Sequence, residues 1–204
     1  MDANSFKLFH TVPYSVIPNS GGAVKFSVFC PYVILNKTGL DLIFKAKSFM
    51  QNAKIAAGQS SNRMVQNKAL PLMFSYGKTE NGNRMLVQVG GNSQWSRPVS
   101  FEAVGSIMEI AVQAAERQAT ERPEEIHLGM NVELGKGKYA LTKVVTITPR
   151  FILKNNLDED LNFREYCSNN VTLLPAHQRV PLRYMRQGQQ KLLSLRLPGV
   201  TSRW

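Results

Sequence analysis

The 204-residue chain has no apolar run close to the roughly 20 residues that a membrane-spanning helix needs. Its first residues lack the charged-then-apolar layout of a secretory signal peptide. It also has only two cysteines, Cys30 and Cys167, at non-equivalent places in the repeat described below. A disulfide framework would repeat with its module, so we expect two free thiols in a reducing, cytoplasmic compartment. A single Cys30–Cys167 bridge is the alternative.

Residue clusters that carry catalysis or bind metals are missing as well. The three histidines, His10, His127 and His177, lie far apart, and none has another His, Cys or carboxylate at metal-ligand spacing. There is no G-x-S-x-G elbow, and neither cysteine has a nearby histidine. The acidic residues 158–160 lack the spaced ligands of a calcium loop, which favours a solvated turn. We predict a non-enzymatic protein with no cofactor and no metal.

Acidic residues are scarce toward the end of the chain. The formal net charge is +11, and residues 166–204 include six basic residues and no acidic one. Such a surface favours acidic partners, namely anionic lipid headgroups, nucleic acid or an acidic protein segment. A solvated face, or a side covered by neighbouring domains, is the alternative interpretation. Aromatic residues clustered on one basic sheet, which base stacking needs, are not evident from the spacing, so nucleic acid is not expected.

One stretch of the sequence occurs twice. Residues 31–44 read PYVILNKTGLDLIF, and residues 149–163 read PRFILKNNLDEDLNF. With one residue added before the asparagine, Asn36 matches Asn155, which follows it by 119 residues. Flanking segments match in the same order: 25–30 with 143–148, 71–76 with 181–184, and 84–89 with 191–196, each copy then running through a Gly to a Trp. This spacing suits a small domain rather than a solenoid unit.

We therefore predict two tandem modules, residues 1–120 and 121–204, joined by an Ala-rich, charged linker at 113–125. Short apolar or alternating segments separated by Gly, Pro and Asn turns predict an all-β fold of two β-sandwich-like repeats. The second repeat lacks the two closing strands of the first, which leaves an edge open or covered by something else. The expected strands are 5–9, 23–29, 32–35, 40–45, 70–76, 84–89, 99–104, 106–112, 127–133, 139–148, 150–153, 160–166, 171–174, 180–185 and 191–197.

The paired asparagines are the most informative polar residues. Asn36 and Asn155 each follow an apolar run and precede a turn, where an amide side chain satisfies backbone groups that a strand end leaves unpaired. The structural interpretation is that each asparagine fastens one turn of its module. The functional alternative is direct contact with a ligand.

The motif around Asn36 resembles the adaptor-binding domain of the vacuolar protein sorting 13 family of lipid-transfer proteins. Residues 30–40, CPYVILNKTGL, fit that pattern well, and residues 152–157, ILKNNL, fit it loosely because the second turn lacks the Thr-Gly pair. Either Asn155 or Asn156 could be the family asparagine. The resemblance covers nearly the whole chain and implies two consecutive β-rich repeats of a longer domain.

The resemblance also implies a function. It predicts a module that binds adaptor proteins through short Pro-x-Pro peptides, which would bring a lipid-transfer protein to organelle contact sites as a peripheral cytoplasmic protein. A proline-bearing peptide can add along an exposed sheet edge, because a proline placed where no donor is needed costs no hydrogen bond. The hypothesis places the peptide on the second repeat, at Val171, Leu173, Leu174, Tyr184, Met185, Leu193 and Leu195. The alternative is a peripheral membrane module that binds anionic lipid through its basic face, with steep salt dependence.

Overall fold

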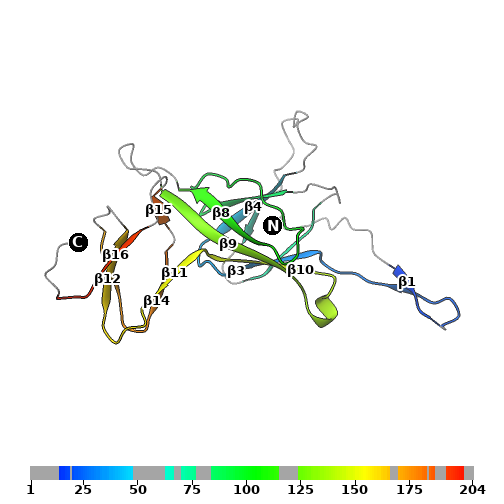
Figure 1. Ribbon diagram of the computed structural model, residues 1–204. Helices are drawn as coiled ribbons and strands as arrows, with labels where there is room; N and C mark the ends of the chain where they lie inside the picture. The colour runs from blue at the N-terminus through cyan, green and yellow to red at the C-terminus, as the bar shows by residue number, and fades with distance from the viewer. Residues whose placement is uncertain are drawn as a thin grey trace, which may run out of the picture.

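The computed structural model describes residues 14–18, 20–47, 63–66, 70–76, 84–114, 124–165, 170–182, 184–186 and 192–199. This part of the chain is built almost wholly from strands, with one short 3-10 helix at Gly137–Tyr139, so the all-β prediction is confirmed (Figure 1). The strands are β1 Tyr14–Val16, β2 Val24–Phe26, β3 Tyr32–Asn36, β4 Leu42–Lys47, β5 Arg63–Gln66, β6 Leu72–Phe74, β7 Arg84–Val89, β8 Ile107–Gln113, β9 Glu124–Leu134, β10 Lys143–Pro149, β11 Phe151–Lys154, β12 Leu161–Glu165, β13 Thr172–Leu174, β14 Arg179–Leu182, β15 Tyr184–Arg186 and β16 Leu193–Arg196.

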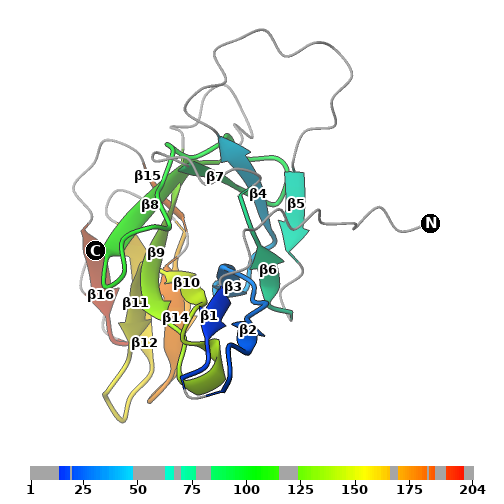
Figure 2. The same ribbon diagram turned by 90° about the vertical axis from the view of Figure 1, so that its right-hand side faces the viewer.

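Two sheets form what we call the first sandwich. The larger has the order β15-β9-β10-β3-β6, with β8 also paired to β9, and the smaller has the order β5-β4-β7. Figure 2 shows β8 and β9 across from β4 and β5. One cluster of buried side chains joins both sheets. Its fully buried members include Ile34, Phe44, Met85, Val87, Phe101, Ile110, Val132, Val145 and Ile147.

Two strands that follow residue 120, β9 and β10, belong to this core. β10 lies parallel to β3, with Val145 opposite Ile34, and antiparallel to β9. β9 also pairs antiparallel with β8 along Ile107–Gln113. The boundary of the packed unit therefore differs from the predicted repeat boundary at residue 120. The β9–β10 ribbon belongs to the second predicted repeat by sequence, but it packs against strands of the first.

Five further strands form what we call the second unit, made of the pair β11–β14 and the sheet β13-β12-β16. Their pairing reproduces that of the first sandwich: β12 lies between β13 and β16 as β4 lies between β5 and β7, and β11 pairs with β14 as β3 pairs with β6. Burial differs, because Phe163 and Leu174 are the buried apolar residues that the structure describes in these five strands. Large apolar side chains remain exposed at Ile152, Leu173 and Leu195.

A separate two-stranded ribbon lies at the other end of the molecule. β1 and β2 pair antiparallel, from Tyr14 opposite Phe26 to Val16 opposite Val24. The ribbon projects from the first sandwich on the side away from the second unit (Figure 1). β2 was predicted as a half-buried strand, but all three of its residues are exposed.

Several element predictions are confirmed and others are not. The strand at 84–89 is confirmed to the residue, whereas 99–104 holds only an isolated bridge between Val99 and Met85. β1 and β5 lie outside the strands expected from the sequence. Cys30 carries a free thiol, as expected. The predicted strand 5–9, the middle of the linker and Cys167 lie outside the described residues.

Candidate functional site

Each predicted asparagine fastens a turn, and the two do so in the same way. Asn36 donates its amide N–H to the carbonyl of Leu40 at 2.7 Å, and its side-chain oxygen accepts from the N–H of Thr38 at 3.0 Å. Asn155 donates to the carbonyl of Glu159 at 2.8 Å and accepts from the N–H of Leu157 at 3.0 Å. In both turns, the amide N–H bonds to the carbonyl four residues ahead and the amide oxygen bonds to the N–H two residues ahead.

Asn155 makes further bonds that tie its turn to a neighbouring strand. Its amide also donates to the carbonyl of Leu174 at 3.1 Å and to that of Pro175 at 3.2 Å, and its backbone N–H donates to Gln178. Asn155 is buried whereas Asn156 is exposed, so Asn155 is the counterpart of Asn36. Because both amides bond to backbone groups of their own turns, these contacts agree with the turn-fastening interpretation.

In the first sandwich, an extended segment covers the outer edge of β7. Val99 donates its N–H to the carbonyl of Met85 at 2.8 Å, and Met85 returns a bond at 2.7 Å. Ser96 donates its N–H to the carbonyl of Val87 at 2.8 Å, while its hydroxyl accepts from the N–H of Val87 at 3.0 Å. Pro98, which stands between these contacts, is exposed and has no N–H to leave unpaired. An extended segment that contains a proline thus completes this edge.

β16 takes the place of β7 in the second unit. Phe44 lies opposite Val87, and Phe163 lies opposite Leu195, so Leu195 corresponds to Val87 and Leu193 to Met85. Val87 is fully buried, whereas Leu195 is 54% exposed. Among the described strands, β16 pairs with β12 alone. The second unit therefore has an apolar strand edge at the position that residues 96–99 cover in the first sandwich.

Six of the seven residues predicted for peptide contact lie on three strands in two sheets, and Val171 directly precedes β13. Register across β12 places Leu174, Leu193 and Leu195 on one face of the β13-β12-β16 sheet and Leu173 on the opposite face. The other two strand residues, Tyr184 and Met185, lie on β15, which pairs with β9 in the larger sheet. The structure therefore brings Leu193 and Leu195 together at one edge.

Exposure separates these residues further. Val171, Leu173 and Leu195 are exposed and Leu193 is half-buried, so a bound peptide could reach them. Leu174 and Met185 are 2% and 7% exposed, so they support the fold from beneath rather than offering surface. The side chain of Tyr184 lies outside the described residues. The edge cover by residues 96–99 was missed at the sequence level, where Pro98 was its only signal.

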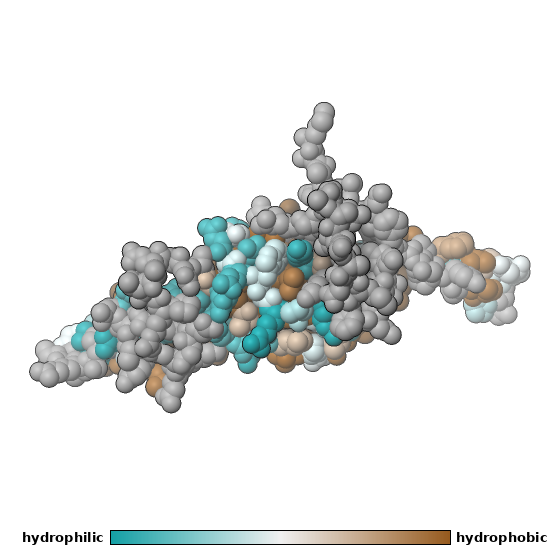
Figure 3. Space-filling model, turned by 90° about the horizontal axis from the view of Figure 1, so that it is seen from above, coloured by the Kyte–Doolittle hydropathy of each residue, from teal (hydrophilic) through white to brown (hydrophobic). Residues whose placement is uncertain are grey.

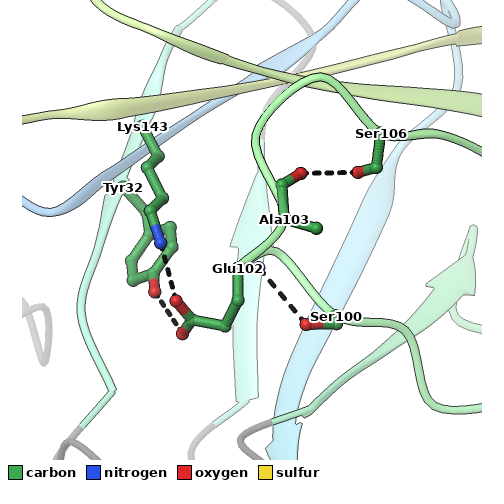
Figure 4. A network of polar contacts seen from close by, with 6 residues as sticks. All are labelled: Tyr32, Ser100, Glu102, Ala103, Ser106 and Lys143. Carbon is green, nitrogen blue, oxygen red and sulfur yellow. Dashed lines mark hydrogen bonds and ion pairs between the residues drawn. The ribbon is translucent and has the colours of Figure 1, made fainter.

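A polar cluster closes the first sandwich where β3 meets β10. Glu102 accepts a hydrogen bond from the Tyr32 hydroxyl and an ion-paired bond at 2.7 Å from the Lys143 ammonium group (Figure 4). Burial alone would raise the pKa of Glu102, but the hydrogen bonds from Lys143 and Tyr32 and the charges of Lys143 and Arg84 lower it below its usual range. The cluster holds a carboxylate in its charged form beside the first residues of β3 and β10, which is a structural role.

His127 is the one histidine that the structure buries among those it describes. Its Nδ1 lies 2.5 Å from a carboxylate oxygen of Glu109, and its Nε2 lies 3.3 Å from one of Glu125. Arg150 reaches the second oxygen of Glu109 at 3.8 Å, and the ring of Phe151 packs against the imidazole. Charged groups thus surround His127 at the junction between β9 and β11. Within the described ranges, no group of three or more His, Cys, Asp or Glu residues could hold a metal ion.

Among the residues that the structure describes, no helix is long and apolar enough to cross a membrane. The fold is that of an all-β module in which, among the described strands, the apolar strand β16 pairs on one side only. Comparison with known proteins agrees: residues 3–204 match the model of the adaptor binding domain of vacuolar-sorting associated protein 13. The chain belongs to this family.

Related proteins show how small a part of them the chain represents. It is 45% identical over 94% of its length to the intermembrane lipid transfer protein VPS13 of Chaetomium thermophilum, and 29% identical over 98% to VPS13D of Homo sapiens. VPS13D of Drosophila melanogaster is 24% identical over 98% of the chain. The chain spans only 6%, 5% and 5% of these relatives, respectively.

Proposed function

We propose that this chain is a non-enzymatic module that captures Pro-x-Pro peptides of adaptor proteins along the edge of β16. In a longer protein of the family, this capture would recruit a lipid-transfer protein to organelle contact sites. The proposal treats the chain as two consecutive repeats, 1–120 and 121–204, with the peptide bound on the second.

The observation that carries the proposal is the segment 96–99 on β7. There, a proline-containing segment completes a strand edge through backbone hydrogen bonds and the Ser96 hydroxyl, which supports a similar pairing of a peptide with β16. The corresponding residues on β16, Leu193 and Leu195, offer apolar contact beside the same kind of edge. Backbone bonds would give the peptide its affinity, and contacts of its alternate side chains with the sheet would give specificity.

A peripheral membrane module is the second candidate, and it rests on charge. Lys154 and Arg179 are exposed and lie directly opposite each other across β11 and β14, on a chain with net charge +11. Such a face attracts anionic lipid, with a free energy that falls as salt screens it. A peptide on β16 would instead depend on backbone pairing and apolar contact, and only weakly on salt.

The test is a titration of a short fluorescent peptide with one Pro-x-Pro core, beside a copy with both prolines changed to alanine, at low and high salt. Binding that needs the prolines and survives salt is expected. Binding that ignores the prolines and disappears at high salt would reject the peptide edge and favour the basic surface.

Two variants locate the peptide. Leu195→Lys should weaken binding by about tenfold or more, because it places a charge beside the β16 edge where apolar contact is proposed. Leu173→Lys is the matched control, since Leu173 is similarly exposed on the same sheet but faces the other way. A larger loss from Leu173→Lys would move the peptide to the β13 edge or the outer face.

A further inference from the structure

The turn that joins β9 to β10 presents large apolar side chains to solvent. We call residues 134–142 the hairpin tip, since Leu134 lies opposite the first residue of β10. Within it, Leu134 is 54% exposed, Tyr139 58% and Leu141 54%. The tip lies at the lower margin of the molecule in Figures 1 and 2, below the sheet to which its strands belong. Large apolar side chains gathered on one exposed turn mark a contact surface.

The backbone of the hairpin tip is closed by its own hydrogen bonds. Gly135 donates its N–H to the carbonyl of Thr142 at 2.8 Å, and Thr142 donates to the carbonyl of Tyr139 at 2.8 Å. The short 3-10 helix Gly137–Tyr139 fills the turn. A Cβ at position 135 would overlap the carbonyl oxygen of Tyr139, so this position requires glycine. The tip is therefore an ordered turn that holds its apolar side chains at the surface.

Lysines accompany these apolar side chains. Residues 134–143 contain three lysines and no acidic residue. Lys136 and Lys138 are exposed, and the Nζ atom of Lys138 lies 5.1 Å from the centroid of the Tyr139 ring. The third, Lys143, is held in the polar cluster where β3 meets β10. The tip thus combines apolar surface with positive charge.

Shape and charge together favour a lipid bilayer over a protein as the partner. A specific protein interface buries about 800 Å² of complementary surface on each partner, which one projecting turn cannot supply. A bilayer needs no matching shape, because apolar side chains enter it below the headgroups while lysines stay at headgroup level. Anionic headgroups complement the lysines.

The other described surfaces fit this contact less well. The acidic residues 158–160 belong to the second unit, which Figure 1 shows well away from the hairpin tip. Seen from above, on the side away from the tip, hydrophilic residues occupy much of the described surface in the middle of the molecule (Figure 3). An anionic bilayer would therefore meet the molecule at the tip.

We propose that the hairpin tip is a membrane-contact site. It inserts Leu134, Tyr139 and Leu141 into the interface of an anionic bilayer and places Lys136 and Lys138 among the headgroups. The site uses neither the β16 edge nor the basic face of β11 and β14, and the tip and β16 are apart in Figure 1. One chain could therefore hold a peptide and a bilayer at the same time.

Cosedimentation of the 204-residue protein with vesicles tests this proposal. The vesicles are phosphatidylcholine alone, or phosphatidylcholine with increasing phosphatidylserine. We expect binding that grows with phosphatidylserine and that salt weakens without abolishing, because salt screens the lysines but not the apolar insertion. A protein that binds no vesicle of either kind would overturn the proposal.

Two double variants locate the contact. Tyr139→Gln with Leu141→Gln should weaken vesicle binding by about tenfold or more, since two apolar side chains can no longer leave water favourably and the charge is unchanged. Leu70→Gln with Met73→Gln is the matched control at similarly exposed apolar side chains on and beside β6, and it should bind as the wild type does. A tip variant that binds as tightly as the control would place the contact elsewhere and reject the tip.

Insertion itself is measured with Tyr139→Trp. Phosphatidylcholine brominated on its acyl chains quenches a tryptophan that enters the bilayer, but not one that stays in water. We expect stronger quenching than in the wild type, whose own Trp95 and Trp204 supply the background. Quenching no stronger than that of the wild type would show that the tip stays outside the bilayer, which overturns the proposal.

Lys154→Gln with Arg179→Gln separates the hairpin tip from the basic face of β11 and β14. This variant should keep its vesicle binding at moderate salt, because the tip is intact. If it loses vesicle binding while the tip variant keeps it, the membrane contact lies on the second unit and the proposal fails. Peptide binding at β16 enters none of these measurements, so its failure would leave their outcomes unchanged.

Discussion

At the scale of single residues, the two asparagine turns show how one side chain organises a strand end. Each amide supplies a donor and an acceptor to backbone groups that no strand could pair. The sequence predicted this role from position alone, because Asn after an apolar run and before a turn has few other uses. It could not decide between Asn155 and Asn156, since that choice depends on Leu174, a partner 19 residues away.

Asn155→Ala should destabilise the protein by about 2–4 kcal/mol, because it leaves buried carbonyl groups without their donor. Asn36→Ala should cost about 1–2 kcal/mol, because its turn is less buried. Urea unfolding followed by far-ultraviolet circular dichroism measures both. The control is Asn156→Ala, at an exposed neighbour, which should change the free energy of unfolding by less than about 0.5 kcal/mol. An equal cost at Asn155 and Asn156 would contradict the assignment.

Two buried tyrosines should make stability depend on pH in the alkaline range. Burial raises the pKa of Tyr32 above its usual value of 10.0, and the hydrogen bond to Glu102 and its charge raise it further; burial and Glu102 also raise the pKa of Tyr76. The folded state thus favours the neutral phenols. Their contribution is fully present below about pH 10 and is lost as the pH rises toward the folded-state pKa values.

Absorbance of phenolate during alkaline titration tests this expectation. Two of the six tyrosines should ionise only as the protein unfolds. Tyr76→Phe should leave stability unchanged or raise it slightly, because the buried Tyr76 hydroxyl has no hydrogen-bond partner among the described residues. If all six tyrosines ionise in the folded protein near pH 10, the two phenols are not held neutral by burial.

At the scale of elements, the strands with strong periodicity were predictable and the sparsely apolar ones were not. β7 buries Met85, Val87 and Val89, with Gln88 buried between the last two, and β12 buries Phe163 at its centre. β1 and β5 were missed because their pairing partners, rather than their own composition, make them strands. Residues 99–104 were predicted as a strand, but the structure shows an irregular segment there. Its apolar residues Val99 and Phe101 are buried in the core.

Register was also hidden from the sequence. The alignment placed an extra residue just before Asn155, which matched Ile34 with Ile152. The alternation of burial instead matches Ile34 with Leu153 and Tyr32 with Phe151, so that the extra residue falls at Arg150. A shift of one residue turns every side chain to the other face of a strand, and only the partner strands fix which face is inside.

At the scale of the whole molecule, the first sandwich depends on strands from both sides of the predicted boundary at residue 120. Sequence similarity marks where a pattern begins again, but it carries no information about which neighbour a ribbon packs against. β9 and β10 supply at least five fully buried side chains to a core that begins at Tyr32. Cohesion between consecutive segments therefore comes from a shared core rather than from a linker.

A fragment of residues 1–120 should consequently fail to fold, whereas a fragment of residues 1–150 should unfold cooperatively. Each buried side chain of β9 and β10 contributes about 1.5–3 kcal/mol, and the sum is comparable to the whole stability of a typical domain. Thermal unfolding of the two fragments by circular dichroism measures the difference. A cooperative transition in the shorter fragment would show that the sequence repeat is an independent folding unit.

The parallel pairing of β3 with β10 sets the order of events during protein synthesis. Tyr32 cannot meet Lys143 until all the intervening chain has left the ribosome, and such distant contacts form slowly because the loop must close first. Until then the nascent chain displays the apolar edge of β3 to its surroundings, where other strands could pair with it. In a protein built from such units, each newly synthesised ribbon would pair with the exposed strand edge of the unit before it. Each unit would therefore complete its folding only after the start of the next unit has been translated.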